Sequence, residues 1–573
     1  MKAIRWSIQL SSLIALSFAL TVVEARADAN SVVLENATGG PFAAFNGSGQ
    51  VIGMIESDIP DTSHVYFVKG NFQLINIGDN PPANTWPQLV DTHATEVAGV
   101  MISTDVTTIG VAPGAGVYAA GGLGGYYPTA GPTNTALDFQ TNVINAINFL
   151  AAQPNLHVIN MSIGLDSVID VNPNGTDVVV RTYNTSGTSV WERAMDNIAS
   201  TKAVSIVVAA GNEGKFRSAG ANSDGGTNSV GEQAGAYNLI AVGSVTNAPA
   251  GTATNMSFFS SRGYLANGRS AVAIVAPGEG INMPTTNVPA GLGSTATTTA
   301  NGTSFAAPAV AATIARLAQF ASNRFTAVPS VATDAQDPRT MKALLLNSAT
   351  KLAGWGQGSV FGGTAGLTGS LTGGVTTVRQ PLDPNQGAGL LNANGAYLTM
   401  DAGKKSPTLQ PNGLITIVNS AVTPTGWDFN TVKLSLTNTY QVSGQVGGSM
   451  AITLDWYRDV AAAVAGTNSI LGMANLDLYL YASLDSAFTN VSLTAQSISS
   501  IDNVEHLWFT NLPSAYYEFM IGYTGYDSQG GPTVMNEQYG LAWTFTVPEP
   551  SSLLLAGLGI STLWWQTKRR RRA

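Results

Sequence analysis

Through residues 49–400, short apolar runs alternate with longer segments in which apolar residues recur at helical spacing. Runs such as Gln50–Ile55 and Val204–Ala209 have the length and composition of buried strands. Between such runs, Asn134–Ala152 and Ser189–Ser200 show the periodicity of amphipathic helices. Strands that alternate with helices predict an α/β unit built on a parallel, doubly wound sheet.

The pattern changes after this unit. Residues 401–412 are typical of a linker, and residues 413–547 contain successive alternating strands without helical stretches of similar length. Ser449–Trp456 and Tyr516–Tyr523 are examples. This pattern predicts an all-β, antiparallel sandwich of jelly-roll type as a second domain.

The composition fits a large folded protein and excludes several classes. The chain has 573 residues, so we expect two or three domains. Only 11% of the residues are charged, and the net charge of -9 leaves no basic face for nucleic acid. The chain has 0 cysteines, which excludes disulfides, thiolate metal sites and a thiol nucleophile.

The N-terminal end has the pattern of a secretory signal peptide over residues 1–27. Lys2 and Arg5 precede an apolar run, and Ala25-Arg26-Ala27 offers a small-residue cleavage site. The alternative is a first membrane helix, which the serines in the run and the cleavage site disfavour. Residues 28–48 then form a short, loop-like segment.

The C-terminal end, residues 548–573, has a second export pattern. Pro548-Glu549-Pro550 leads into an apolar stretch that is short for a membrane span, and a basic cluster closes the chain. This tail resembles the PEP-CTERM sorting signal. The resemblance implies export, recognition by an exosortase-type membrane enzyme, membrane contact through residues 551–565 before processing, and removal of the tail. A plain C-terminal anchor is the alternative, and both readings put most of the protein outside the cytoplasm, in the cell envelope or beyond.

Ser304 is the first candidate for chemistry. Gly302-Thr303-Ser304 ends a Gly-rich approach, and the small-residue helical run to Ala312 follows directly. The hydroxyl therefore lies at a helix N-terminus, where unpaired N–H groups and the helix dipole favour developing negative charge. The alternative is that Ser304 only caps a buried helix, because Ser is a favoured N-cap.

Other segments change the balance between these readings. Glu56 follows the strand that ends at Ile55, and the carboxyl ends of parallel strands are where α/β folds keep their chemistry. His93, one of only 4 histidines, begins a small-residue helix. Seven motifs in this order resemble the subtilisin-like serine proteases over about Gln50 to Thr399. They are His93-Ala-Thr-Glu-Val-Ala-Gly, Gly110-Val-Ala-Pro, Asn160-Met-Ser-Ile-Gly, Ala209-Ala-Gly-Asn-Glu-Gly, Phe259-Ser-Ser-Arg-Gly, Val275-Ala-Pro-Gly and Gly302-Thr-Ser-Phe-Ala-Ala-Pro.

The resemblance implies a role for each of these polar groups. Ser304 would be the nucleophile, and His93 would be the general base and then the acid. Asn212 would donate its side-chain N–H to the oxyanion, unless it is only a turn residue. Six further residues would bind the substrate backbone and the side chain before the scissile bond, although the polarity of the first could be ordinary strand polarity. They are Ser162, Ile163, Gly164, Ala209, Ala210 and Gly211.

Two positions depart from the family pattern. Glu56 stands where the family has Asp, and its extra methylene shifts the carboxylate by about 1.5 Å. Asp58, two residues on, is therefore an alternative partner for His93, although the register of Ile55-Glu56-Ser57 favours Glu56. Glu96 stands where the family usually has a second histidine, and we expect it to face solvent or to stabilise the first helical turn.

The leading prediction is therefore an exported serine endopeptidase that acts on protein or peptide substrates. The alternative is a catalytically inactive subtilisin-like fold that serves as a surface or extracellular-matrix binding protein. A sedolisin-type peptidase uses Glu where His93 stands and is disfavoured. No cofactor or catalytic metal is expected. Asp477, Asp485 and Asp502 are candidates for structural calcium, but solvated strand-end carboxylates are the favoured reading.

Overall fold

The computed structural model of this chain describes residues 41–68, 70–76, 90–121, 136–164, 186–214, 229–246, 255–286, 294–361, 367, 369, 371, 374–406, 421–444, 446–463, 468–528 and 533–546. The predicted signal peptide (1–27) and sorting segment (548–573, including 551–565) lie outside the described residues.

In the described part of the chain, eight strands form the first sheet, in the order β2-β3-β1-β4-β5-β6-β7-β8. All neighbours from β2 to β7 run parallel, and β8 joins the edge antiparallel. The predicted parallel sheet is confirmed. Its strands are β1 (Val51–Ile55), β2 (Phe72–Asn76), β3 (Gly116–Gly121), β4 (Leu156–Met161), β5 (Ser205–Ala209), β6 (Ile240–Thr246), β7 (Ile274–Pro284) and β8 (Thr297–Asn301).

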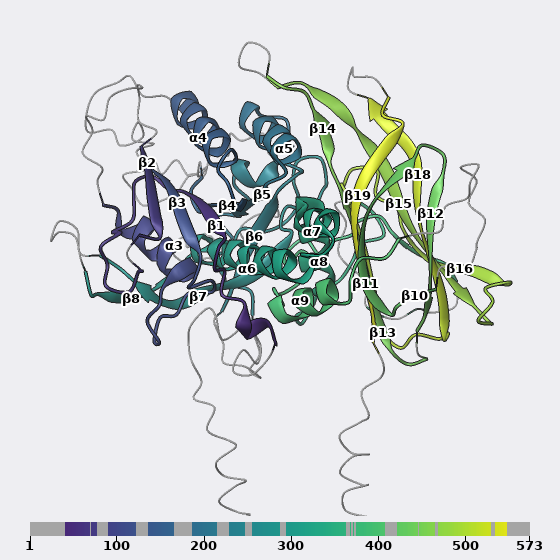
Figure 1. The fold of residues 1–573 in the computed structure, drawn as a ribbon. Helices are drawn as coiled ribbons and strands as arrows, with labels where there is room; N and C mark the ends of the chain where they lie inside the picture. The colour runs from purple at the N-terminus through teal and green to yellow at the C-terminus, as the bar shows by residue number, and fades with distance from the viewer. Residues whose placement is uncertain are drawn as a thin grey trace, which may run out of the picture.

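Helices cover both faces of this sheet, as the doubly wound prediction requires (Figure 1). Successive strand residues point to opposite faces, so Met54 joins the core under α3 and α6, whereas Ile55 joins the core under α4 and α5. The helices of the unit are η1 (Pro41–Ala44), α3 (Thr92–Ile102), α4 (Ala136–Leu150), α5 (Val190–Lys202), η2 (Glu232–Gly235), α6 (Thr303–Arg324), α7 (Pro329–Gln336), α8 (Pro338–Ser348) and α9 (Ala393–Asp401).

The second half of the chain is a β-sandwich, as predicted. One sheet has the order β10-β12-β18-β15-β16-β9 with β14 on β15, and the other has the order β11-β19-β13-β17. Large aromatic side chains fill the space between the sheets; Tyr440 and Phe519 stack with ring centroids 5.0 Å apart. The strands are β9 (Thr376–Val378), β10 (Ala421–Val422), β11 (Thr425–Lys433), β12 (Thr437–Ser443), β13 (Ser449–Trp456), β14 (Arg458–Val460), β15 (Ile470–Ser483), β16 (Val491–Ser497), β17 (Val504–Phe509), β18 (Tyr516–Ser528) and β19 (Asn536–Thr546).

The sandwich packs directly against the α/β unit along α8 (Figure 1). Gly540 of β19 lies so close to this helix that an added Cβ would stand 2.3 Å from the carbonyl carbon of Arg339. Lys342 of α8 pairs with Asp455 of β13 at 2.8 Å, with both side chains buried. Trp427 of the sandwich belongs to the same hydrophobic core as α6 and α8. The two units therefore share a core.

The three aspartates considered for calcium have different environments. Asp477 and Asp502 are buried, so the expectation of solvated carboxylates is wrong for these two. Asp477 accepts from the hydroxyl of Tyr479 at 2.8 Å, and Asp502 accepts from that of Ser499 at 2.7 Å. Among the described residues, no group of three or more His, Asp or Glu side chains is arranged to hold a metal ion.

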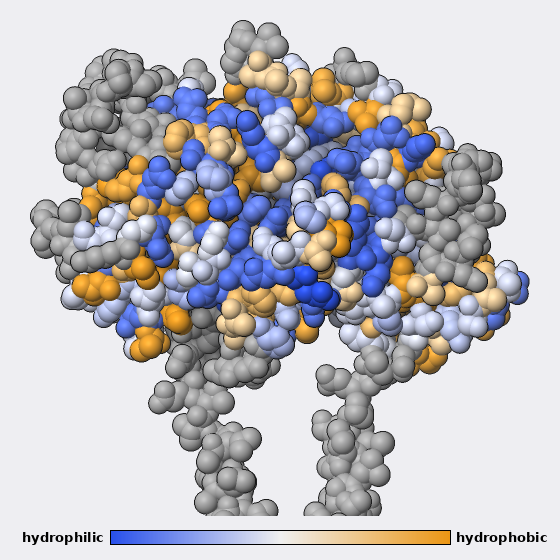
Figure 2. Space-filling model, viewed as in Figure 1, coloured by the Kyte–Doolittle hydropathy of each residue, from blue (hydrophilic) through white to orange (hydrophobic). Residues whose placement is uncertain are grey.

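Figure 2 shows polar and apolar residues intermixed over one face of the molecule. Among the described residues, the most exposed large apolar side chains, such as Val106 and Leu484, come from separate loops. Within the described ranges, no helix has both the length and the apolar character needed to cross a bilayer.

Candidate active site

Glu56 and His93 meet at the carboxyl edge of the sheet. Glu56 comes directly after β1 and is fully buried, and its Oε2 lies 2.8 Å from Nδ1 of His93. His93 stands in the first turn of α3, which begins there because Asp91 caps it and accepts from the N–H of Ala94 at 2.7 Å. The imidazole remains partly open, with 37% of its side chain exposed.

The pair shifts the acidity of both groups. Burial raises the pKa of Glu56, and the neighbouring imidazole opposes this rise. Burial lowers the pKa of His93, but the charge of Glu56 and its hydrogen bond outweigh burial and raise the pKa to about 9. Since Nδ1 faces the carboxylate, Nε2 carries the lone pair when the ring is neutral.

Asp58 makes no hydrogen bond to His93 in the described part of the chain. Its carboxyl is half-buried, and burial together with the charge of Asp91 raises its pKa to about 6. Of the two carboxylates weighed from sequence, the structure brings Glu56 to the ring. Glu96 is also placed differently from expectation: it lies beyond the first turn of α3 and accepts from the hydroxyl of Thr285 at 2.7 Å.

Ser304 lies in the first turn of α6. The ring of Phe305, its neighbour in the chain, has its centroid 5.7 Å from that of His93. The hydroxyl of Ser304 donates to the carbonyl oxygen of Ser162 at 3.1 Å rather than to His93. Transfer of its proton to His93 would therefore require the hydroxyl to turn away from this carbonyl, and side-chain reorientation of this kind is fast.

Asn212 follows β5 and is exposed. Thr303 of α6 orients its side-chain amide. Its Oδ1 accepts from the backbone N–H of Thr303 at 2.9 Å and lies 3.1 Å from the hydroxyl of the same residue. The amide N–H₂ therefore points away from Thr303 and makes no hydrogen bond with the described residues. Thr303 stands inside the Gly-Thr-Ser motif, but the motif alone indicates no role for its side chain.

The six residues expected to bind substrate lie at the carboxyl end of β5 and on the continuations of β4 and β5. These strands are parallel neighbours, with Met161 opposite Val208. Ser162 is buried, and its hydroxyl donates to the carbonyl of Ser304 at 2.8 Å, so it is a structural partner of α6 as well as part of the strand edge. Ile163 and Gly164 are partly exposed, whereas Ala209, Ala210 and Gly211 are buried. A further residue, Gln233 of η2, lies against Gly164 after β4 and against Ala209 of β5. It belongs to none of the sequence motifs, so the sequence alone did not indicate it.

Comparisons with known proteins identify the family of the chain. The model of the Subtilase family matches residues 47–365, more than half of the chain, and the PEP-CTERM protein-sorting motif matches residues 546–572. Among solved structures, the chain is similar to the prenylagaramide maturation protease PagA (19% identity, covering 61% of this chain and 93% of that one, TM-score 0.39). It is also similar to a cold adapted subtilisin-like serine proteinase (19% identity, covering 58% of this chain and 92% of that one, TM-score 0.36). A third similar structure is that of the MycP3 protease from the type VII (ESX-3) secretion system (20% identity, covering 66% of this chain and 90% of that one, TM-score 0.40).

Proposed function

The chain belongs to the subtilase family and is a serine-type peptidase, and within that family we propose that it is an exported endopeptidase whose catalytic residues are Glu56, His93, Asn212 and Ser304. The observation that carries the proposal is the 2.8 Å contact between the buried carboxylate of Glu56 and Nδ1 of His93. The ring of Phe305, which follows Ser304 in the first turn of α6, lies with its centroid 5.7 Å from that of His93. A buried carboxylate that orients an exposed imidazole beside a hydroxyl is the arrangement that activates a serine.

In the proposed reaction, Ser304 Oγ leaves the Ser162 carbonyl and donates its proton to Nε2 of His93 as it attacks the peptide carbonyl carbon. The negative charge on the carbonyl oxygen is stabilised by the Nδ2–H of Asn212 and by the backbone N–H of Ser304 at the start of α6. His93 then gives the proton to the leaving amine, and an ester to Ser304 remains. Water hydrolyses this acyl-enzyme by the same steps, with His93 again as the base.

The other groups of the site support this reaction by orienting His93 and by binding the substrate. Glu56 accepts from Nδ1–H, so it fixes the tautomer of His93 and stabilises the imidazolium. The segment from Ser162 to Gly164 would pair with an extended substrate backbone, which is how a strand edge binds peptides. The side chain before the scissile bond would then enter between this segment and Ala209–Gly211.

An active-site probe tests the catalytic part of the proposal. Purified protein is incubated with a biotinylated fluorophosphonate, and the labelled peptide is identified by mass spectrometry. We expect one label per chain on Ser304, lost in Ser304→Ala and strongly reduced in His93→Ala, with the fold of each variant checked by circular dichroism. A correctly folded native protein that takes no label would instead fit the inactive, binding reading of the fold.

Export is a separate part of the proposal. The PEP-CTERM match supports recognition of the C-terminal tail by an exosortase-type enzyme of the cell envelope. We expect that, in a host with such an enzyme, the exported protein lacks the basic end Arg569–Arg572, as measured by intact mass. An exported protein of full mass at its C-terminus would contradict removal of the tail.

A further inference from the structure

We infer, resting on the proposed function, that Gln233 closes the pocket for the side chain before the scissile bond, so that this peptidase cleaves after small residues such as Gly, Ala and Ser. Gln233 belongs to the short helix η2.

The expected walls of this pocket are the ends of two parallel strands, β4 and β5. Ser304 contacts one continuation through the carbonyl of Ser162, and Thr303 contacts the other through Gly211 and Asn212. A substrate carbonyl held at Ser304 with its oxygen toward Asn212 therefore places the preceding side chain between Gly164 on one wall and Ala209–Gly211 on the other.

The amide of Gln233 occupies this space. A Cβ added to Gly164 would stand 2.1 Å from Nε2 of Gln233, and one added to Gly231 would stand 2.5 Å from the same atom. The amide thus rests against two glycines, where any larger residue would collide with it. On the opposite wall, Nε2 lies 3.5 Å from the carbonyl oxygen of Ala209. The side chain of Gln233 spans the gap between the two walls.

Burial shows that the amide is packed rather than solvated. Gln233 is 2% exposed, and its Oε1 makes no hydrogen bond with any described residue. A buried acceptor without a partner is unfavourable, so the amide is not held by satisfying both of its polar atoms. The contact of Nε2 with the carbonyl oxygen of Ala209 and close packing against Gly164 and Gly231 hold it.

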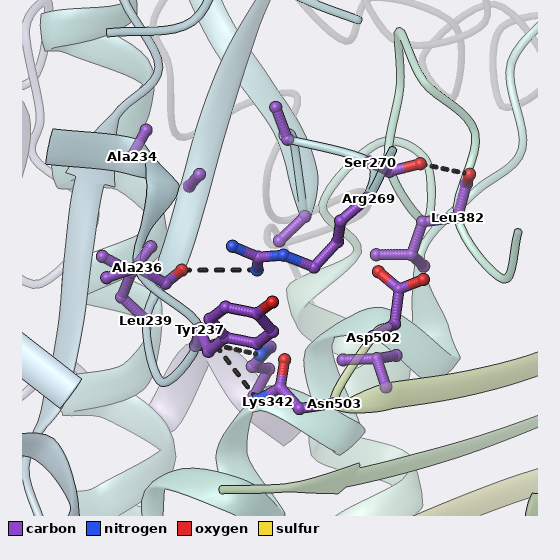
Figure 3. Close-up of a pocket in the computed structure, with 14 residues that line it drawn as sticks. Ala234, Ala236, Tyr237, Leu239, Arg269, Ser270, Lys342, Leu382, Asp502 and Asn503 are labelled. Carbon is purple, nitrogen blue, oxygen red and sulfur yellow. Dashed lines mark hydrogen bonds between the residues drawn. The ribbon is translucent and has the colours of Figure 1, made fainter. Parts of the chain in front are cut away.

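The backbone behind Gln233 is fixed at the contact with the sandwich. Tyr237 donates its N–H to Asp196 Oδ1 at 2.9 Å. Its ring lies between two guanidinium groups, that of Arg269 at 3.7 Å (Figure 3) and that of Arg458 at 4.2 Å. A long substrate side chain could enter only by rotating the amide of Gln233 out of the gap, because η2 is held in place.

Peptide cleavage by the full-length protein tests the inference. Two fluorogenic peptides, identical except for Ala or Leu before the scissile bond, are compared by their kcat/KM values. We expect the native protein to prefer Ala. Gln233→Ala removes the amide and its chain, so the Leu/Ala ratio should rise by about 100-fold, since one methylene in an apolar pocket already changes the ratio about 10–200-fold.

The matched control is Gln386→Ala. Gln386 is also buried, also has an Oε1 without a hydrogen bond in the described residues, and also donates to a backbone carbonyl, that of Ala353 at 3.1 Å, away from the site. Its ratio should equal that of the native protein. If Gln233→Ala does not fold, Gln233→Asn shortens the same side chain and should shift the ratio in the same direction.

Fluorophosphonate labelling of Ser304 is measured on every variant. Normal labelling with a native preference for Leu, or with no change of ratio in the Gln233 variants, overturns the inference and leaves the proposed function intact. Absence of labelling in the native protein overturns the proposed function and this inference with it.

Discussion

The length of a single side chain decides how His93 is held. Glu56 is fully buried, and its Oε2 reaches Nδ1 of His93 at 2.8 Å from the end of β1. An aspartate at the same backbone position would end about 1.5 Å short. The sequence pattern showed this departure from the family but could not show whether the backbone compensates; in the structure, Glu56 makes the contact.

Glu56→Asp should therefore reduce kcat. With the carboxylate about 1.5 Å further from the ring, the hydrogen bond to Nδ1 opens, and a misplacement of about 1 Å can cost about 100-fold in rate. The measurement is kcat and KM on one fluorogenic peptide, with Asp58→Asn as control, because Asp58 makes no hydrogen bond to the ring. Full activity in Glu56→Asp together with a large loss in Asp58→Asn would reverse the assignment.

The pH dependence follows from the raised pKa of His93. Burial lowers this pKa, but Glu56 outweighs burial and raises it to about 9, and only the neutral ring can accept a proton. We expect kcat/KM to increase as the pH rises to about 9, because the neutral fraction of His93 increases over this range. The same ion pair stabilises the fold below pH 6.5 and loses that contribution as the pH rises through about 9.

Glu56→Gln separates the charge of the carboxylate from its shape. Without the charge, the pKa of His93 should fall, and the rising limb of kcat/KM should move to lower pH while its maximum is reduced. The measurement is kcat/KM of the native protein and of the variant from about pH 5 to 10 in the same buffers. If kcat/KM of both proteins rises over the same pH range, a group other than His93 controls the reaction.

At the scale of elements, the start of α6 organises the site. Thr303 precedes Ser304, and its N–H and hydroxyl hold Oδ1 of Asn212, while its hydroxyl also lies 3.2 Å from the N–H of Gly211. One residue of the helix thus sets the direction of the amide of Asn212, the proposed oxyanion donor, and directly precedes Ser304, the proposed nucleophile. Gly211 has a φ of 110°, which a residue with a side chain rarely adopts, so this close approach needs glycine.

Thr303→Val tests this role. The valine keeps the shape and the backbone N–H but loses the hydroxyl contacts to Asn212 and Gly211, so we expect kcat to fall by about 10-fold or more with little change in KM, because loss of a whole oxyanion donor costs about 10²–10³. Thr313→Val is the control in the same helix, since the hydroxyl of Thr313 bonds only the carbonyl of Ala309 in the described structure. Equal kcat values for the two variants would exclude the positioning role.

The elements with an apolar pattern were predictable from sequence, and those without one were not. β1, α3 and α6 follow from buried runs and helix-start signals. β8 (T-T-T-A-N) is a polar edge strand with alternating exposure, so no apolar run marks it. The orientation of Asn212 and the position of Gln233 depend on contacts with distant segments, which spacing along the chain does not encode.

At the scale of the whole molecule, the sandwich is part of the peptidase core rather than a separate appendage. Val504 and Ala542 join the cluster built from α6 and α8, and β9, which comes from the α/β half, pairs with β16 of the sandwich. A small cavity with room for about one water molecule (about 20 Å³) lies at this contact, lined in part by Arg269, Lys342 and Asp502 (Figure 3). Sequence patterns predicted two units but not their shared core.

The ion pair between Asp196 of α5 and Arg458 of β14 joins positions 262 residues apart, with side chains only 0% and 5% exposed. Asp196 also accepts from the N–H groups of Tyr237 and Asn238, so it connects the sandwich to the segment after η2. Asp196→Asn keeps the size but leaves the buried charge of Arg458 unpaired, which we expect to lower the free energy of unfolding by about 3–5 kcal/mol.

Urea denaturation followed by tryptophan fluorescence measures this loss. Asp401→Asn is the matched control, because it breaks the exposed ion pair with Arg324, whose side chains are 42% and 51% exposed, and should change stability by less than about 1 kcal/mol. Since α5 and η2 belong to the α/β unit, a shared core predicts that Asp196→Asn lowers the unfolding midpoint of both halves together. A variant in which only the sandwich loses stability would show that the two units fold independently and that the ion pair serves docking alone.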